Sequence, residues 1–310
     1  MTEPVVENLE EVKVERKDVK GGSLASTFKL FKDVLKRDKM AMFGVVVLIF
    51  FILVAAFAPL IAPYDPYEMN RTEDGAIARL EPPSAQHWFG TTNLGRDVFS
   101  QVVMGSRIAL LVGFLAAFLV TFIGTNVGLI AGYYGGAIDN FLMRVVDIMY
   151  ALPFIPFVII LVALLDPSIW NIILAISLLT WRTVARIIRS QVLSVANRPF
   201  IKAAKVAGAS DLRIMYKYIA PNIIPIALLE MAFMVSWAIL AEASVSFIGF
   251  GDPDVISWGQ ILHTSFLTGA IRTAWWWVIP PGVAIVLVLV AIFFTARAFE
   301  EIVNPRLRRR

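Results

Sequence analysis

Residues 197–222 read NRPFIKAAKVAGASDLRIMYKYIAPN, a polar and basic stretch rich in small residues that lies between two long apolar runs. The whole chain has 310 residues, of which 58% are hydrophobic and only 17% are charged, and its mean hydropathy is +0.73. Ordinary soluble domains are about half apolar and about a quarter charged. Because the excess is concentrated in runs near the ~20 residues that cross hydrocarbon, the chain is predicted to be an all-α, polytopic membrane protein.

Six apolar runs are long enough to be transmembrane helices. They cover roughly residues 40–62, 107–131, 144–165, 168–188, 222–247 and 275–297. Ahead of them, residues 1–23 mix charges of both signs and are expected to form a disordered tail. Residues 24–39 place apolar side chains on one helical face opposite lysines, which favours an amphipathic helix at the membrane interface; a solvated linker is the alternative. Residues 40–310 are then one transmembrane domain.

Lysines and arginines in the loops predict the orientation. Nine of them precede residue 40, and the chain ends in Arg306-Leu-Arg-Arg-Arg310. Eight lie in the loop around 182–217 against one acid, Asp211. Both termini and the 197–221 segment are therefore predicted to be cytoplasmic.

The connections on the other side carry few cations. Residues 166–167 and 248–274 contain only Arg272, whereas residues 63–106 mix both signs and are rich in Pro, Gly and Asn. We expect 63–106 to be an extracytoplasmic loop of turns and short helices. Pro153 and Pro156 predict a kink in the third span.

The 197–221 segment contains the start and stop residues of two short helices. Pro199 fits the first turn of a helix, where its missing N–H is no loss, and Gly208 fits the stop. Ser210 fits the N-cap of a second helix, and Asp211 in its first turn is favoured by the helix dipole. Pro221 is expected to end it.

Small residues on adjacent turns of this segment would let another backbone approach closely. Cations at the rim suit phosphate or carboxylate groups: Lys205, Arg213 and Lys217. Two interpretations stay open at this point. The segment either docks on a cytoplasmic partner or is a basic loop that touches lipid headgroups.

The segment also resembles the EAA loop of the integral subunits of ABC importers, which reads Glu-Ala-Ala, three residues, Gly, nine residues, Ile-x-Leu-Pro. This chain has Lys202-Ala203-Ala204, then Gly208, then Tyr218-Ile219-Ala220-Pro221. The Ala-Ala, Gly and Pro match in register. Lys202 replaces the Glu, and Tyr218 and Ala220 stand at the Ile and Leu positions.

Other segments are similar to one branch of that family, the second (C-type) permease of dipeptide and oligopeptide systems. The resemblance covers roughly residues 28–310 and departs at Phe293–Arg297. The matching segments are His87–Thr91 with Asn93–Asp97, Gly132–Gly136 with Asp139, Leu142–Arg144 and Asp147–Ile148, Glu242–Gly251 with Ser257–Gly259, Pro280–Gly282 and Asn304–Arg308.

The resemblance implies a type I, MetI-like permease fold in the cytoplasmic (inner) membrane. It also implies a second permease subunit, two ATP-hydrolysing subunits and an extracytoplasmic binding protein as partners. The 197–221 loop would lie in a groove on the ATPase. The coupling residues would be Lys202, Ala203, Ala204, Lys205, Ala207, Gly208, Ala209, Ser210, Asp211, Arg213, Lys217 and Pro221.

Several chemistries are disfavoured. No GxxxxGK[ST] loop occurs, so nucleotide phosphates have no cradle here, and ATP with Mg²⁺ is expected on the partner subunits. The chain has no cysteine, no HExxH, and only His87 and His263, which are far apart. We therefore expect no cofactor, no metal, no catalytic residue and no nucleic-acid partner.

A secondary transporter is the rival from another class, because such proteins rely on intramembrane carboxylates. Its candidates are Glu230, Glu242 and Asp147; Asp147 also fits an i,i+3 pair with Arg144. In an ABC permease the translocation path has different candidates, each of which also fits plain packing: Thr121, Asn126, Ser177, Glu230, Ser236, Trp237 and Glu242.

The outer loop supplies candidates for binding-protein docking or an outer gate, with a purely structural loop as the alternative: His87, Gly90, Asn93, Arg96 and Asp97. The expected cargo is a di- or oligopeptide. Oligosaccharides come next, because the lack of cysteine and the low Asn and Gln content fit a thermophile; nickel or glutathione is a further alternative.

Overall fold

A computed structural model describes residues 37–303, with side chains to residue 300. Nearly all of the 1–39 region, including the expected interfacial helix, lies outside these residues. The helices are α3 Lys39–Ala56, α4 Ala58–Ile61, α5 Val98–Tyr134, α6 Gly136–Ala151, α7 Phe154–Leu165, α8 Ile169–Ala196, α9 Pro199–Val206, α10 Asp211–Arg213, the π-helix η1 Ile214–Ile219, α11 Ala220–Val245, the π-helix η2 Ser246–Phe250, α12 Trp258–Leu267, the 3₁₀ turn η3 Ala270–Arg272 and α13 Trp275–Val303.

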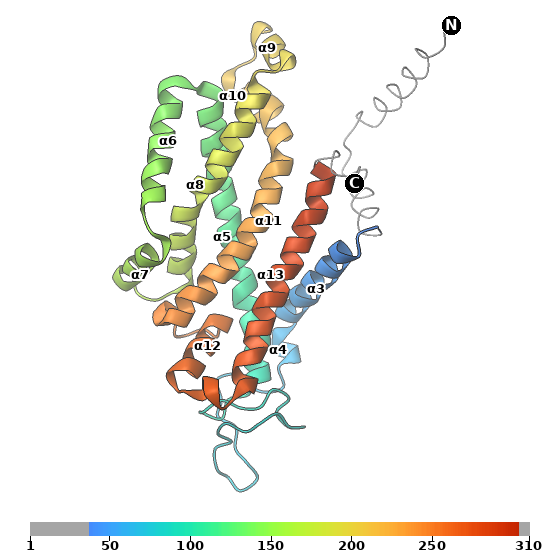
Figure 1. Cartoon of the computed structure of the whole chain (residues 1–310), viewed down its shortest axis with the longest axis vertical. Helices are drawn as coiled ribbons and strands as arrows, with labels where there is room; N and C mark the ends of the chain where they lie inside the picture. Colours follow the sequence, from blue (N-terminus) through green and yellow to red (C-terminus); the bar gives the residue numbers. More distant parts are fainter. Residues whose placement is uncertain (1–36, 304–310) are drawn as a thin grey trace, which may run out of the picture.

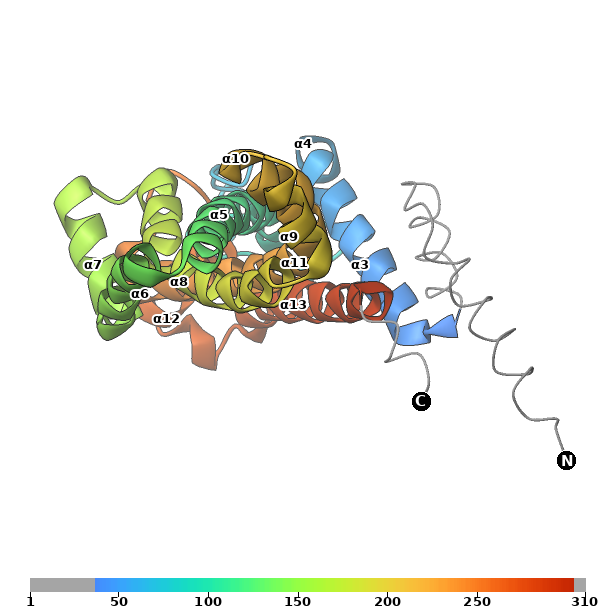
Figure 2. The same ribbon diagram turned by 90° about the horizontal axis from the view of Figure 1, so that it is seen from above.

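The molecule is an elongated helical bundle, as the apolar runs predict. Viewed from above, α6 and α7 lie at one side and α3 at the other, with α5, α8, α11 and α13 between them (Figure 2). Helix α9 projects at one end of the bundle, and the loop of residues 62–97 covers the opposite end (Figure 1). We call these the α9 end and the outer-loop end.

Within residues 37–303, five helices are long and apolar enough to cross a membrane, with the continuous run Asp211–Phe250 counted as one. Helices α6 and α7 make a sixth span if the bent pair counts as one. The kink predicted for residues 144–165 is larger than expected. Two separate helices, α6 and α7, meet there at 87° across Leu152 and Pro153. Pro153 favours extended backbone in the residue before it, and Leu152 has ψ 119°. The chain therefore turns a corner here.

Several helices are longer than the apolar runs from which they were predicted. Helix α5 has 37 residues, or about 55 Å at ~1.5 Å per residue, against a hydrocarbon core of ~30 Å. Residues 98–106, expected in the outer loop, are its first turns, and Arg182, Arg186 and Arg189, expected in a loop, lie on α8. Backbone hydrogen bonding can continue a helix beyond its apolar segment, so the apolar run does not mark the end of the helix.

Glycines allow a close contact between α5 and α8. Gly124, Gly128 and Gly132 recur every four residues of α5 and face the α8 backbone. A Cβ at Gly128 would lie 2.5 Å from the Ala185 carbonyl oxygen. This is the small-residue packing of membrane helices, where close backbone approach replaces the hydrophobic effect as the source of attraction.

The outer loop holds turns and two isolated β-bridges, Arg71 with Ile77 and Thr91 with Asp97, and residues 62–97 contain none of the short helices expected there. Backbone bonds such as Leu80 N–H to Thr92 C=O (3.0 Å) fold it back on itself. Trp276 of α13 donates its indole N–H to the Thr91 carbonyl (3.3 Å), which fastens the loop to the bundle.

Candidate functional site

The projecting hairpin begins with α9 and closes at Gly208. Ala207 is the C-cap, Gly208 has φ +79°, and its N–H donates to Lys205 C=O (3.1 Å) while Ala209 N–H donates to Ala204 C=O (3.0 Å). This pair of bonds is a Schellman motif, in which glycine takes the left-handed position at no steric cost.

The second arm of the hairpin differs from the prediction in two respects. Ser210 stands at the N-cap of α10, but its side chain makes no capping bond. Pro221 does not end the helix, because α10 continues through η1 into α11. In the wider π-helical turn, Ala220 N–H donates to Met215 C=O, five residues back, and this register accommodates the donor that Pro221 lacks.

One face of the hairpin is anchored and the other is free. Ile201, Ile214 and Ile219 are buried in a core cluster with α8 and α11. Away from this anchored face, Val206 is 90% exposed and Leu212 65% exposed, and Phe200 is exposed as well. These three apolar residues are not among the coupling residues predicted from the sequence. Of the predicted coupling residues, all but the partly buried Ala204 and Ala209 are exposed.

Two tyrosine hydroxyls join the hairpin to the nearby end of α5. Tyr133 donates to Asp211 Oδ1 (2.6 Å), and Tyr216 donates to Asn126 Oδ1 (2.8 Å). The Asn126 amide also donates to Phe122 C=O (2.7 Å), so its polar atoms are engaged within the chain. A displacement of the hairpin would therefore pull on α5 as well as on α11.

Arginines of α8 bond to α6 along one edge. Arg189 holds Asp139 with two N–H donors (2.5 and 2.6 Å), and Arg186 holds Asp147 (2.7 Å). The expected Arg144–Asp147 pair is therefore not formed. Arg182 donates to the Met149 carbonyl. The Arg182 and Arg186 guanidinium groups lie 4.7 and 4.4 Å from the Tyr150 ring centroid, within cation–π range.

The residues predicted for the path divide into interior and surface positions. Thr121 and Ser177 are buried and Ser236 partly buried, and their hydroxyls have no partner among the described residues. Glu242 is 2% exposed and accepts from the Ser246 hydroxyl (2.7 Å). These positions lie in the interior of this chain, and their role in the path stays a prediction.

Three path candidates remain reachable. Glu230 and Asn126 are only partly buried. Trp237 is 40% exposed and packs on Phe154 with ring centroids 5.4 Å apart. Trp237 also borders a cavity of about 370 Å³ at the α6–α7 corner, together with Pro153 and Pro156.

The outer-loop candidates form a clamp at the start of α5. Asp97 is its N-cap, with Oδ2 accepting from Ser100 N–H (2.7 Å) and Oδ1 bonded to His87 Nδ1 (2.9 Å), and both side chains are buried. Gly90 has φ +64°, and a Cβ there would lie 2.4 Å from Glu81 C=O. These three residues shape the loop, whereas Asn93 and Arg96 line a cavity beneath it.

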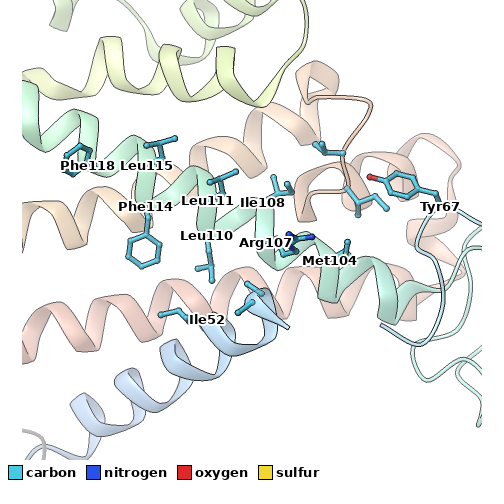
Figure 3. A pocket seen from close by; sticks show the side chains of 14 residues that line it. Ile52, Tyr67, Met104, Arg107, Ile108, Leu110, Leu111, Phe114, Leu115 and Phe118 are labelled. Atoms are coloured by element: carbon cyan, nitrogen blue, oxygen red, sulfur yellow. The ribbon is translucent and has the colours of Figure 1, made fainter. Parts of the chain in front are cut away.

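A larger groove of about 940 Å³ runs along α5 toward α3 (Figure 3). Its lining is apolar apart from Arg107 and the Tyr67 hydroxyl; Ile52, Leu111 and Phe114 are typical members. Tyr67 donates to Asp254 C=O (3.1 Å), and partial burial raises the pKa of its phenol, so it stays a neutral donor at physiological pH. Such a surface is normally covered by acyl chains or by a neighbouring transmembrane helix.

The bundle, with its broken span and projecting hairpin, defines a polytopic membrane protein. A family model described as binding-protein-dependent transport system inner membrane component matches residues 124–309, and one for the N-terminal transmembrane domain of oligopeptide transport permease C matches residues 26–83. The chain belongs to this family of transport permeases and is a permease subunit of an ABC importer, a non-catalytic component.

Relatives agree over nearly the full length. The dipeptide transport system permease protein DppC of Bacillus subtilis (strain 168) is 36% identical over 296 residues, covering 95% of this chain and 90% of that protein. The oligopeptide transport system permease protein OppC of the same strain is 32% identical, covering 91% and 92%. A solved structure of the inward-facing MetNI methionine ABC transporter matches with TM-score 0.52 at 19% identity, over 66% of this chain and 95% of that one, which shows the fold.

Proposed function

We propose that this permease forms half of a translocation path for di- or oligopeptides in the cytoplasmic membrane. The support is the family and the full-length relatives, whose printed names are dipeptide and oligopeptide permeases. These names favour peptides over oligosaccharides, nickel or glutathione as cargo. The other half of the path belongs to a second permease subunit, and an extracytoplasmic binding protein delivers the cargo.

The α9–α10 hairpin is the coupling element in this proposal. The observation that carries it is a free apolar face, Val206 and Leu212, on a hairpin whose opposite face is anchored in the bundle. Exposed apolar anchors with a polar rim are typical of protein interfaces, and a short helix in a groove is a recurrent mode of docking. Lys202, Lys205 and Arg213 supply the rim.

The partner on this hairpin is an ATP-hydrolysing subunit, which holds ATP and Mg²⁺. Closure of the two ATP-hydrolysing subunits around ATP would move the hairpin. The bonds from Tyr133 and Tyr216 would then carry that movement to α5, while η1 carries it to α11. ATP shifts the permease only if it binds the two conformations of the complex with different affinity. On this model the α9 end and both termini are cytoplasmic.

Co-purification tests the docking surface. Replacing Val206 with Asp places a charge in the proposed contact, and we expect at least a tenfold loss of ATPase subunits on the purified permease, the effect of roughly 1.4 kcal/mol or more. Met69→Asp makes the same kind of change at an exposed apolar residue of the outer loop and serves as the control. Full ATPase recovery with Val206→Asp would overturn the assignment.

Uptake in proteoliposomes tests the cargo. The permease is reconstituted with its second permease, ATPase and binding protein, and labelled dipeptide, pentapeptide and trisaccharide are offered in turn. We expect ATP-dependent peptide uptake that survives dissipation of ion gradients. Uptake of the trisaccharide alone would replace the cargo assignment, and uptake that needs an ion gradient without ATP would contradict the proposed mechanism.

A further inference from the structure

A polar cavity lies beneath the outer loop, where it meets the 251–257 segment, α12 and α13. Its volume is about 180 Å³. Since one liquid water occupies ~30 Å³, a carboxylate group and a few waters fit inside. Tyr67, Val255 and Ile256 line both this cavity and the groove of Figure 3. The cavity and the apolar groove are therefore neighbours of opposite character.

Four polar atoms of the cavity wall have no hydrogen-bond partner among the described residues. They are Asn93 Oδ1, Arg96 Nε, Gln260 Oε1 and Trp277 Nε1. They make up half of all such buried side-chain atoms in the described part of the chain, and the others are Ser and Thr hydroxyls within helices. Trp277 is 1% exposed, so its indole N–H has little access to bulk water. Buried polar groups are rarely left unpaired, and their concentration here points to a bound group.

The charge of the wall is positive. None of the lining residues is acidic, and Arg96 forms no ion pair within residues 37–300. The nearby Asp65 and Asp252 bond backbone N–H groups and not Arg96: Asp65 accepts from Tyr67 N–H (2.8 Å) and Asp252 accepts from Ile169 N–H (3.1 Å). The lining itself therefore carries the positive charge of Arg96 and no negative charge, which favours an anion.

The donors suit a carboxylate in particular. A guanidinium binds a carboxylate with parallel N–H donors, and the Trp277 indole offers one more. The Asn93 and Gln260 amides present either oxygen or NH₂, because the two ends exchange by rotating the amide by 180°.

We propose that this cavity is a carboxylate-binding site, with Arg96 and Trp277 as its main donors and Asn93 and Gln260 completing it. The carboxylate comes from a small free acid or from an Asp or Glu side chain of a protein docked on the outer loop. The recognition chemistry is the same in both cases, and it does not depend on which cargo the permease carries.

Saturation-transfer NMR with acetate tests the proposal on the full chain, assembled with its partner subunits in nanodiscs. We expect transfer to acetate and none to methylammonium. Arg96→Gln should weaken acetate binding at least about tenfold, as for the loss of a charge-assisted hydrogen bond. Arg79→Gln removes an exposed arginine of the same loop and should leave binding unchanged.

Two further variants keep the test sharp if Arg96→Gln misfolds. Trp277→Phe keeps an aromatic side chain at this position and removes the indole donor, so acetate binding should weaken. Arg96→Lys keeps the charge without the fork and should bind at an intermediate level. Absent transfer in the wild type, or equal transfer in Arg79→Gln and the cavity variants, would overturn the proposal and leave a water-filled cavity.

Adding the binding protein distinguishes a free acid from a protein side chain as the source of the carboxylate. Only this part of the experiment rests on the proposed docking. Loss of the acetate signal on docking assigns the site to a protein side chain. An unchanged signal assigns it to a free acid.

Discussion

Asp147 shows how the partner of one residue depends on the helix beside it. Its local neighbour Arg144 stands three positions away, and such pairs are worth about 0.2–0.5 kcal/mol. Asp147 instead bonds Arg186 of α8, whose guanidinium also lies over the Tyr150 ring. The ion pair is exposed and weak by itself, but the ring contact holds Arg186 in place. The ion pair with Asp147 and the contact with the Tyr150 ring together favour Arg186 over Arg144 as the partner of Asp147.

Gly208 carries a prediction at the same scale. Its φ of +79° costs an ordinary residue about 1–2 kcal/mol, whereas Asn tolerates that region. We expect Gly208→Leu to lower ATP-driven uptake several-fold and Gly208→Asn to stay near wild type. Uptake per assembled complex measures the effect. Wild-type uptake in Gly208→Leu with an intact complex would contradict the coupling role of the hairpin.

Lys202 carries the opposite expectation. It is exposed on α9, at the position where related loops have Glu. We expect Lys202→Glu to assemble and transport normally, because neither residue has to be buried. Complete loss of assembly on size-exclusion chromatography would show that the partner reads this charge.

At the scale of elements, α5 is the helix through which the bundle is organised. It packs on α8 through its glycines, on α11 through Gly113 against Ile239, and on the hairpin through Tyr133. It also begins at the buried His87–Asp97 clamp. One long helix thus joins the outer loop to the α9–α10 hairpin, over a distance greater than the thickness of the hydrocarbon core.

The α5–α8 contact predicts the effect of added volume. Gly128→Val places side-chain atoms where the Ala185 carbonyl lies, and overpacking of this kind costs about 1–3 kcal/mol or more. We expect a lower unfolding temperature in detergent, followed by tryptophan fluorescence. Gly282→Ala, at a glycine with open space around its Cβ position, is the matched control. Equal melting of both variants would show that the helices separate at little cost.

The tyrosine bonds predict a loss of coupling without a loss of docking. Tyr133→Phe and Tyr216→Phe each remove a hydroxyl worth about 1 kcal/mol. We expect each to leave ATPase binding intact and to reduce peptide uptake per ATP hydrolysed, with a larger reduction in the double variant. Unchanged stoichiometry in the double variant would show that movement passes through η1 alone.

At the scale of the molecule, the two ends of the bundle differ in kind. The outer-loop end is a folded cap with a polar cavity, and the α9 end is an exposed hairpin. The first described turn of α3 and the last of α13 both lie toward the α9 end (Figure 1). Two ends on the same side require an even number of membrane crossings, and the chain makes six if α6 and α7 together cross the membrane once.

The absence of cysteine makes this orientation easy to test. We expect Met69→Cys to react with a membrane-impermeant maleimide in intact cells, and Val206→Cys only after permeabilisation; both positions are exposed. The reverse pattern would invert the topology. Labelling of both in intact cells would contradict the six-span arrangement.

Sequence alone indicated the class of molecule, the approximate spans and the hairpin, because hydropathy, charge and Pro–Gly punctuation act locally. It did not indicate that the apolar residues Val206 and Leu212 are exposed, since an isolated exposed residue has no periodic signal. It named Glu242 and Ser177 as path candidates from their polarity, and only the structure shows that both side chains are buried within this chain.

The residues by themselves determined that the chain enters the membrane, where it crosses and which segment stays polar, since the cost of burying charge and unpaired backbone in lipid is paid residue by residue. Only the tertiary structure decided that α6 and α7 meet at a corner and that Asp147 belongs to Arg186. It alone brought Asn93, Arg96, Gln260 and Trp277 around one cavity. Those outcomes depend on contacts between segments distant in the chain, which no local pattern encodes.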